Sequence, residues 1–97
     1  MRLDFEFKVG ENELHSVRFS FDQIWGWLKI SVDGTTVLTD LRLISFGRFK
    51  DYRFVVGERE RHQVLIRKER QWIGAGFRGQ VCHVFIDGKA VGDYVSQ

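Results

Sequence analysis

The sequence contains no proline and a single cysteine, Cys82, in 97 residues. Proline cannot donate to a β-ladder, so its absence is typical of a chain whose strands need their amides, and it argues against a proline-rich linker. One cysteine excludes an internal disulfide framework and favours a reducing compartment. We therefore expect a cytoplasmic protein.

Long apolar runs and a strong net charge are also missing. The first six residues alternate charged and apolar side chains where a signal peptide would need an unbroken apolar core, and no later run reaches membrane-spanning length. Fifteen basic against thirteen acidic residues give a formal charge of +2, too small to indicate an obligate nucleic-acid binder. No membrane partner is expected.

Phenylalanine and β-branched residues are frequent instead, and they recur with period two. No window keeps an apolar stripe at helical spacing for three turns. The pattern predicts an all-β fold, an antiparallel β-sandwich or small barrel of seven to nine short strands joined by hairpins, in one domain spanning residues 1–97. The alternation predicts one shared core that contains Phe19, Leu28, Ile30, Phe54, Val64 and Ile66.

Two Asp-Gly pairs, Asp33-Gly34 and Asp87-Gly88, organise the chain. An Asp-Gly pair between alternating runs is a strong hairpin signal, because a tight primed turn needs positive φ at both central residues. Residues 32–37 and 86–91 share the order apolar, Asp, Gly, polar, small, Val. The sequence thus predicts two hairpin-centred halves, with Gly34 and Gly88 in the left-handed region.

Three segments are less regular. Residues 41–46 have apolar side chains at both odd and even positions, so periodicity does not distinguish a strand from a helical turn. We favour a short or irregular strand. Residues 68–71 are polar, and we expect them to be solvated. Gly74, Gly76 and Gly79 match the spacing of a dinucleotide-binding fingerprint, but a strand follows where that motif needs a helix, so we predict a bend.

The residues that could carry chemistry are few. His15, His62, His83 and Cys82 lack the paired spacing of a zinc site, and the neighbours Cys82 and His83 should point to opposite faces of a strand. No serine lies in a nucleophile elbow, and no glycine-rich loop could cradle a phosphate. We expect no catalytic residue, no metal and no cofactor, and hence a protein that is not an enzyme.

The chain resembles the Fas apoptotic inhibitory molecule family. His15 to Phe19 is similar to the His-x-Ile-x-Phe start of that family, and glycine and Asp-Gly positions follow at similar spacing. The remaining motifs that carry the resemblance are Gly26, Val32-Asp33-Gly34, Phe54-Val55-Val56-Gly57, Val64-Leu65-Ile66, Gly76-Phe77, Ile86-Asp87-Gly88 and Tyr94.

The resemblance implies a non-enzymatic β-sandwich that acts as a cytosolic protein-interaction module in apoptosis regulation and in protection against protein aggregation. This chain has room for one sandwich, where the animal members resemble a tandem of two. Ile24-Trp25 stands where the family pattern has small polar residues.

One candidate partner-binding surface consists of Ile24, Trp25 and Trp27. Asp22-Gln23 interrupts the strand pattern and Gly26 permits a reversal, so these apolar residues should lie at a tip where a small sandwich buries them poorly. Tryptophans at such a position are natural interface anchors, although packing across the sheet edge would also account for them. A protein partner or a homodimer would cover this surface.

The alternative surface is the basic hairpin. Its residues would bind nucleic acid or another polyanion, with a tryptophan as a stacking platform. The interleaved acids Glu58, Glu60 and Glu69 partly cancel its field, and a solvated hairpin tip that resists edge pairing is the more ordinary interpretation. The candidate anion-binding residues are Arg59, Arg61, Arg67, Lys68, Arg70 and Trp72.

Overall fold

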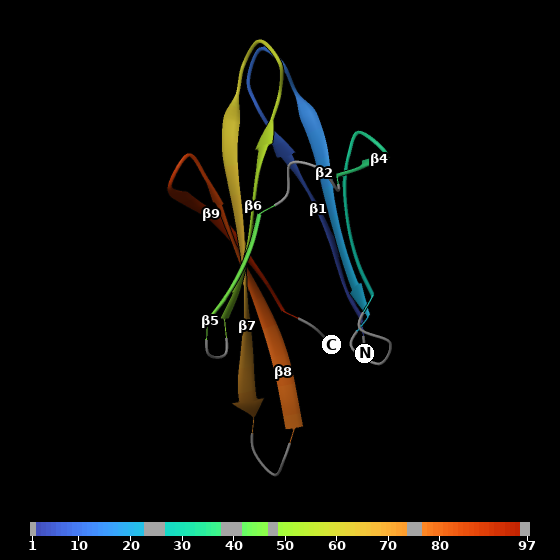
Figure 1. Cartoon of the computed structure of the whole chain (residues 1–97), viewed down its shortest axis with the longest axis vertical. Helices are drawn as coiled ribbons and strands as arrows, with labels where there is room; N and C mark the ends of the chain where they lie inside the picture. The colour runs from blue at the N-terminus through green and yellow to red at the C-terminus, as the bar shows by residue number, and fades with distance from the viewer. Residues whose placement is uncertain (1, 23–26, 38–41, 47–48, 74–76, 96–97) are drawn as a thin grey trace.

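The computed structural model describes residues 2–22, 27–37, 42–46, 49–73 and 77–95, and within them every element is a β-strand (Figure 1). The first sheet contains β1 (Arg2–Val9), β2 (His15–Asp22), β3 (Trp27–Val32) and β4 (Thr35–Thr36). The second contains β5 (Arg42–Phe46), β6 (Phe49–Val56), β7 (His62–Ile73), β8 (Phe77–Ile86) and β9 (Lys89–Val95). In both sheets the spatial order of the strands follows the sequence, and all pairs are antiparallel. The prediction of an all-β sandwich is confirmed. In the described part of the chain no helix is long and apolar enough to cross a membrane.

Alternating side chains of the two sheets form one core, as the period-two pattern predicts. Five of the six predicted core residues are buried, and the sixth, Leu28, is half-buried against them. Aromatic rings join the two layers: Phe19 of β2 meets Tyr52 of β6 edge to face, with 5.8 Å between ring centroids. The described residues buried in this core are Leu3, Phe5, Val9, Val17, Phe19, Ile30, Tyr52, Phe54, Val56, Val64, Ile66, Cys82 and Val84.

Both Asp-Gly turns have the predicted conformation. Asp33 and Gly34 have φ of 50° and 83°, and Asp87 and Gly88 have φ of 51° and 80°. Positive φ at both central residues is the type I′ pattern whose twist matches that of paired strands. These turns connect β3 to β4 and β8 to β9.

The longest hairpin departs from the sequence interpretation. Residues 68–71, predicted to be solvated, continue β7, and Lys68 is only 6% exposed. The expectation of a solvated segment was wrong at Lys68, whose side chain lies on the inner face of the sheet, whereas Arg70 is exposed; β8 pairs with β7 along this whole stretch, from Val64↔Ile86 to Ile73↔Phe77. Figure 1 shows β7 and β8 extending beyond the other strands at the lower end. Of the three glycines of the predicted bend, Gly74 and Gly76 lie outside the described residues, whereas Gly79 lies within β8 and pairs with Gln71.

Candidate interaction site

The end of the sandwich at the top of Figure 1 holds two loops of equal length, residues 10–14 between β1 and β2 and residues 57–61 between β6 and β7. Each loop supplies a glutamate to the other. The Glu60 carboxylate accepts hydrogen bonds from the amides of Glu11 (2.7 Å) and Asn12 (2.9 Å). The Glu13 carboxylate accepts from the amides of Glu58 (2.7 Å) and Arg59 (2.9 Å). We call these two loops, with the side chains that bind them, the loop junction.

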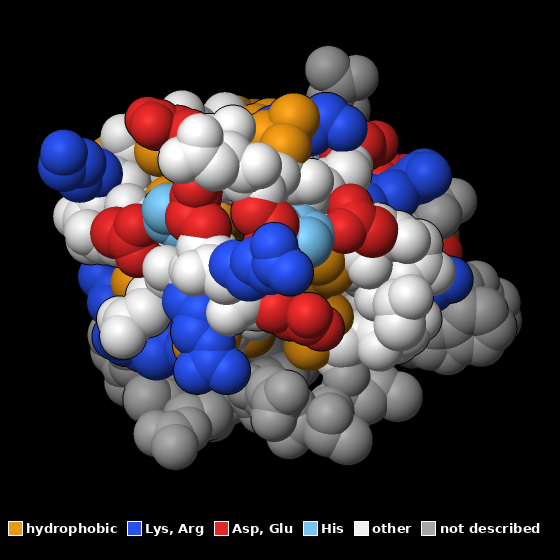
Figure 2. Space-filling model, turned by 90° about the horizontal axis from the view of Figure 1, so that it is seen from above, with side chains coloured by type: hydrophobic (Ala, Val, Ile, Leu, Met, Phe, Trp, Pro, Cys, Tyr) orange, Lys and Arg blue, Asp and Glu red, His pale blue; other side chains and the backbone are white. Residues whose placement is uncertain are grey.

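A histidine at the start of each following strand holds these glutamates in place. His15 Nε2 lies 2.6 Å from Glu13 Oε2, and its Nδ1 lies 2.5 Å from Asp33 Oδ2. His62 is placed in the same way, 2.6 Å from Glu60 and 2.6 Å from Asp87. Figure 2, viewed onto this end, shows two histidine side chains each between acidic side chains. The turn aspartates therefore fix the histidines that orient the loop glutamates.

Each loop begins with a glycine because no side chain fits there. Gly10 and Gly57 have φ of 106° and 102°. A Cβ at Gly10 would lie 2.0 Å from the carbonyl oxygen of Glu13, and one at Gly57 would lie 2.0 Å from that of Glu60. The tight loop that carries each glutamate depends on this glycine.

The loop junction consists of ion pairs that favour the charged form of every member. Hydrogen bonds from His15 and from the amides of Arg59 and Glu58 lower the pKa of Glu13 to about 2. His62 and the amides of Asn12 and Glu11 lower the pKa of Glu60 to about 2. The hydrogen bond to the turn aspartate, followed by that to the glutamate, raises the pKa of His15 and of His62. Both shifts favour the imidazolium form, in which the two ring nitrogens are donors.

The third histidine is also held between two carboxylates, on the outer face of the second sheet. His83 Nδ1 lies 2.7 Å from Asp93 Oδ1, and its Nε2 lies 3.2 Å from Glu69 Oε2. Burial lowers the pKa of His83, but the bonds to Asp93 and Glu69 outweigh this and raise it overall. Its neighbour Cys82 points to the opposite face, as predicted; it lies in the core, and burial raises the pKa of that thiol to about 12. Among the described residues, no group of three or more His, Cys, Asp or Glu is arranged to hold a metal ion.

The basic hairpin residues are not brought together. Arg59 and Arg61 are exposed in the loop junction. Arg70 lies nine residues after Arg61, which is about 30 Å along the chain at the rise per residue of a β-strand. Arg67 is on the outer face, where its Nε and Nη2 donate to the buried Asp51 at 2.8 and 2.9 Å. Lys68 is on the inner face, with its Nζ 3.3 Å from the Phe21 ring centroid. The side chain of Trp72, on β7, lies outside the described residues.

The predicted partner surface falls largely outside the described residues as well. Ile24 and Trp25 belong to the segment 23–26, and of Trp27 the structure describes the backbone, which begins β3 and pairs with Asp22. This surface remains a prediction.

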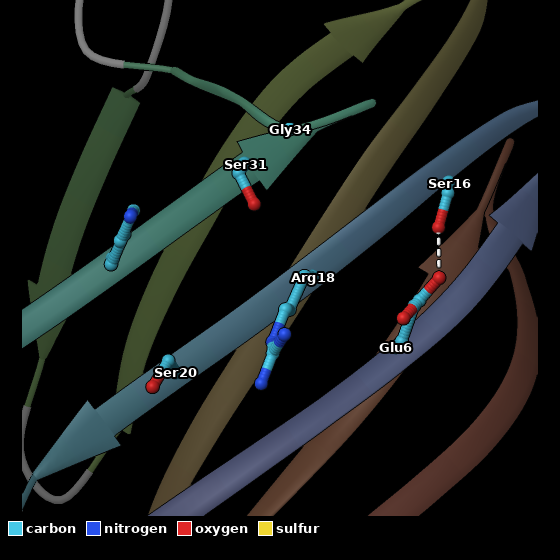
Figure 3. A pocket seen from close by; sticks show the side chains of 7 residues that line it. Glu6, Ser16, Arg18, Ser20, Ser31 and Gly34 are labelled. Carbon is cyan, nitrogen blue, oxygen red and sulfur yellow. Dashed lines mark hydrogen bonds between the residues drawn. The ribbon is translucent and has the colours of Figure 1, made fainter.

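A shallow groove of about 490 Å³ crosses the outer face of the first sheet (Figure 3). It exists because short serine side chains on β2 and β3 stand between longer charged ones. Arg18 is fixed by two hydrogen bonds to Asp4, at 3.1 and 2.9 Å, and the Ser16 hydroxyl donates to Glu6. No ion pair joins the exposed Lys29 to another described residue. The groove is lined by Glu6, Ser16, Arg18, Ser20, Lys29, Ser31 and Gly34.

No protein-family model, no curated protein and no solved structure matches this chain.

Sequence reasoning missed the loop junction and the groove. A signal for the junction was present, because Val9 to His15 and Val56 to His62 both have the order Val-Gly-Glu-x-Glu-x-His. Together with the paired Asp-Gly turns, this repeat would have placed a glutamate, a histidine and an aspartate equivalently in each half. The groove had no such signal, since it depends on which outward serines become neighbours across strands.

Proposed function

We propose that this protein is a non-enzymatic protein-interaction module whose partner binds the outer face of the first sheet. The groove carries the proposal. It is lined by serines, whose hydroxyl groups can both donate and accept hydrogen bonds, and Lys29 supplies a cation that pairs with no described carboxylate. Such a surface suits the polar backbone and an acidic side chain of a partner protein.

The contacts of the histidines and the burial of the cysteine support the same proposal. Each of the three histidines is held by an aspartate and a glutamate, and Cys82 is buried with a raised pKa. These contacts stabilise loops and strands and leave the side chains in poor positions to act as bases or nucleophiles. The resemblance to the Fas apoptotic inhibitory molecule family would place such a module in the cytoplasm, in cell-survival signalling and protection against aggregation.

Binding of nucleic acid or another polyanion through the basic hairpin has less support. Phosphate contacts need cations that share a surface, and here Lys68 lies in the core while Arg67 is bonded to Asp51.

The test measures how much partner the protein captures when the charge of Lys29 is reversed. Lys29→Glu should lower capture from the source cell by about tenfold, the effect of losing one charge-assisted contact of about 1.4 kcal/mol. Lys89→Glu is the matched control, because Lys89 is equally a strand lysine, is exposed, and lies on β9 away from the groove.

Capture by Lys29→Glu at the parent level would refute the groove as the partner site. Binding to a single-stranded oligonucleotide that falls steeply between two salt concentrations would favour the polyanion alternative, since counterion release makes phosphate contacts salt-dependent.

A further inference from the structure

The two halves of the sandwich correspond in strand order, loops and turns, although β7, β8 and β9 are longer than β2, β3 and β4. β1 to β4 and β6 to β9 follow the same order, with loops of equal length, the same Asp-Gly turn and the same histidine contacts. The shared Val-Gly-Glu motif makes β1 the counterpart of β6, with Glu6 at the position of Arg53. In the second sheet β5 pairs with β6 as a further strand, whereas among the described strands β1 has β2 as its one neighbour in the first sheet.

The backbone of β1 is oriented to accept such a strand. The Asp33 amide donates to the Ser16 carbonyl at 2.8 Å, so even-numbered residues of β2 bond to β3 and odd-numbered ones to β1. The odd-numbered residues of β2 lie opposite odd-numbered residues of β1, such as Phe5 and Phe7, so these residues of β1 form the hydrogen bonds to β2. The backbone N–H and C=O groups of Glu6 and Lys8 therefore point away from β2. In the second sheet the backbone groups alternate in the same way, and those of Arg53, the counterpart of Glu6, point toward Arg42 of β5.

The side chains beside this edge are aromatic on the inner face and charged on the outer face. The rings of Phe5 and Tyr94 stack with centroids 4.0 Å apart, and Phe7 stacks on Phe5 at 6.1 Å. Phe7 and Tyr94 remain half-buried. An added strand could cover these rings with apolar side chains, while its outward residues would face Glu6, which accepts a hydrogen bond from Ser16 and lies 3.6 Å from the Lys8 ammonium group.

We propose that the edge of β1 accepts one extended segment of a protein partner as an antiparallel strand, in the way that β6 accepts β5. The segment has apolar residues toward Phe7 and Tyr94 and a lysine or arginine opposite Glu6. This inference rests on the proposed function and specifies how a partner would be bound, by main-chain hydrogen bonds that extend the sheet.

A second copy of the chain fits this edge poorly. β9 of the second sheet approaches β1, and Tyr94 lies against Phe5. If two copies paired β1 to β1 about a two-fold axis, both β9 strands, each with its Tyr94, would lie beside the joined edge. A single strand adds to the first sheet without bringing a second β9.

The test uses a fluorescent seven-residue probe peptide, Lys-Val-Arg-Val-Lys-Val-Arg, with a control peptide of the same composition whose valines are contiguous. Fluorescence anisotropy should show binding of the alternating peptide alone. Glu6→Ala removes the acidic side chain and should weaken binding about threefold, as for an exposed ion pair. Glu6→Pro also removes the outward amide, which an edge strand tolerates, and should weaken binding about tenfold further.

Amide exchange gives a readout that does not need a variant. In the parent protein the peptide should protect the amides of Glu6 and Lys8, and leave the already bonded amides of Phe5 and Phe7 unchanged. Absence of peptide binding, or binding without protection at Glu6, would overturn the assignment of this edge. Equal affinity of well-folded Glu6→Pro and Glu6→Ala variants would overturn it too. The proposed function is judged separately, because partner capture that is lost in Lys29→Glu but kept in Glu6→Pro would leave the groove intact and remove the edge.

Discussion

Lys68 places a charged side chain on the inner face of the sandwich. It follows Val64 and Ile66 on the buried side of β7 and faces Phe21 of the first sheet. Burial, with the nearby Lys50 charge second, lowers the pKa of Lys68 to about 8. The ring face of Phe21 compensates in part, since a cation over an aromatic face is worth about 2 kcal/mol when desolvated. An apolar residue at this position would avoid the remaining cost of burying a charge.

We predict that Lys68→Met increases the free energy of unfolding at pH 7 by about 1 kcal/mol or more, because an apolar side chain of similar length avoids burying an ammonium group. The pH dependence should change as well. A lysine whose pKa falls from 10.5 to about 8 on folding binds fewer protons in the folded state, so the parent gains stability as pH rises from 8 to 10.5. Urea unfolding at several pH values measures both effects.

Lys89→Met is the control, since Lys89 is exposed at the start of β9. It should leave the free energy of unfolding within about 0.5 kcal/mol of the parent. A loss of stability in Lys68→Met would show instead that the contact between the ammonium group and Phe21 outweighs the cost of burial.

At the scale of elements, the loop junction links the two sheets through charges. Glu13 belongs to the first half and binds the loop of the second, and Glu60 does the reverse. Because the glutamates have a pKa below 4.5 and the histidines a pKa above 6.5, this link has a pH range of its own.

We predict that the stability contributed by the junction is greatest between pH 4.5 and 6.5. Glu13 and Glu60 have their pKa lowered from 4.5 to about 2, so their contribution is complete above pH 4.5 and is lost as pH falls toward 2. His15 and His62 have a pKa raised above 6.5, so their contribution is complete below pH 6.5 and is lost as pH rises through the raised values. Thermal unfolding across this pH range would show the maximum.

The double variant His15→Gln, His62→Gln should lose most of the decrease in melting temperature on the alkaline side of pH 6.5. His83→Gln, which leaves the junction intact, should keep the part of the decrease that His15 and His62 contribute and lose only that of His83, whose pKa is also raised. An unchanged alkaline decrease in the double variant would assign that decrease to other groups.

The parts of the fold that local chemistry determines were predictable from sequence, and the parts that depend on distant partners were not. Asp33-Gly34 and Asp87-Gly88 fix their turns with two residues each, and alternation identified Phe54 and Ile66 as core. The length of β7 was missed because residues such as Lys68 are polar, and their strand conformation depends on pairing with β8. The contact of Glu13 with Arg59 joins residues 46 apart, which no local pattern specifies without the internal repeat.

At the scale of the whole molecule, two sheets of unequal width leave surfaces that differ in character. The first sheet presents a polar groove and the open edge of β1, whereas the outer face of the second carries bonded pairs such as Arg67 with Asp51. We place the proposed contacts at the first sheet, although the second sheet also exposes Val55, Val91 and Val95. The segment 23–26, which joins β2 to β3 in that sheet, carries the apolar residues that the sequence singles out.

The last prediction concerns association through Ile24 and Trp25. The paired residues Asp22 and Trp27 end one strand and begin the next, and the connection between them has four residues, two of them large and apolar. Connections run over protein surfaces, so we expect this pair to form, with Trp27, a patch that a partner or a second copy covers. Trp25→Ser should therefore shift a self-associating parent toward the monomer mass in sedimentation equilibrium, and should reduce partner capture at unchanged melting temperature. Trp72→Ser is the matched control on β7. Unchanged association in Trp25→Ser together with a loss in Trp72→Ser would remove the 24–27 surface and shift the contact to the hairpin of Arg59 to Trp72.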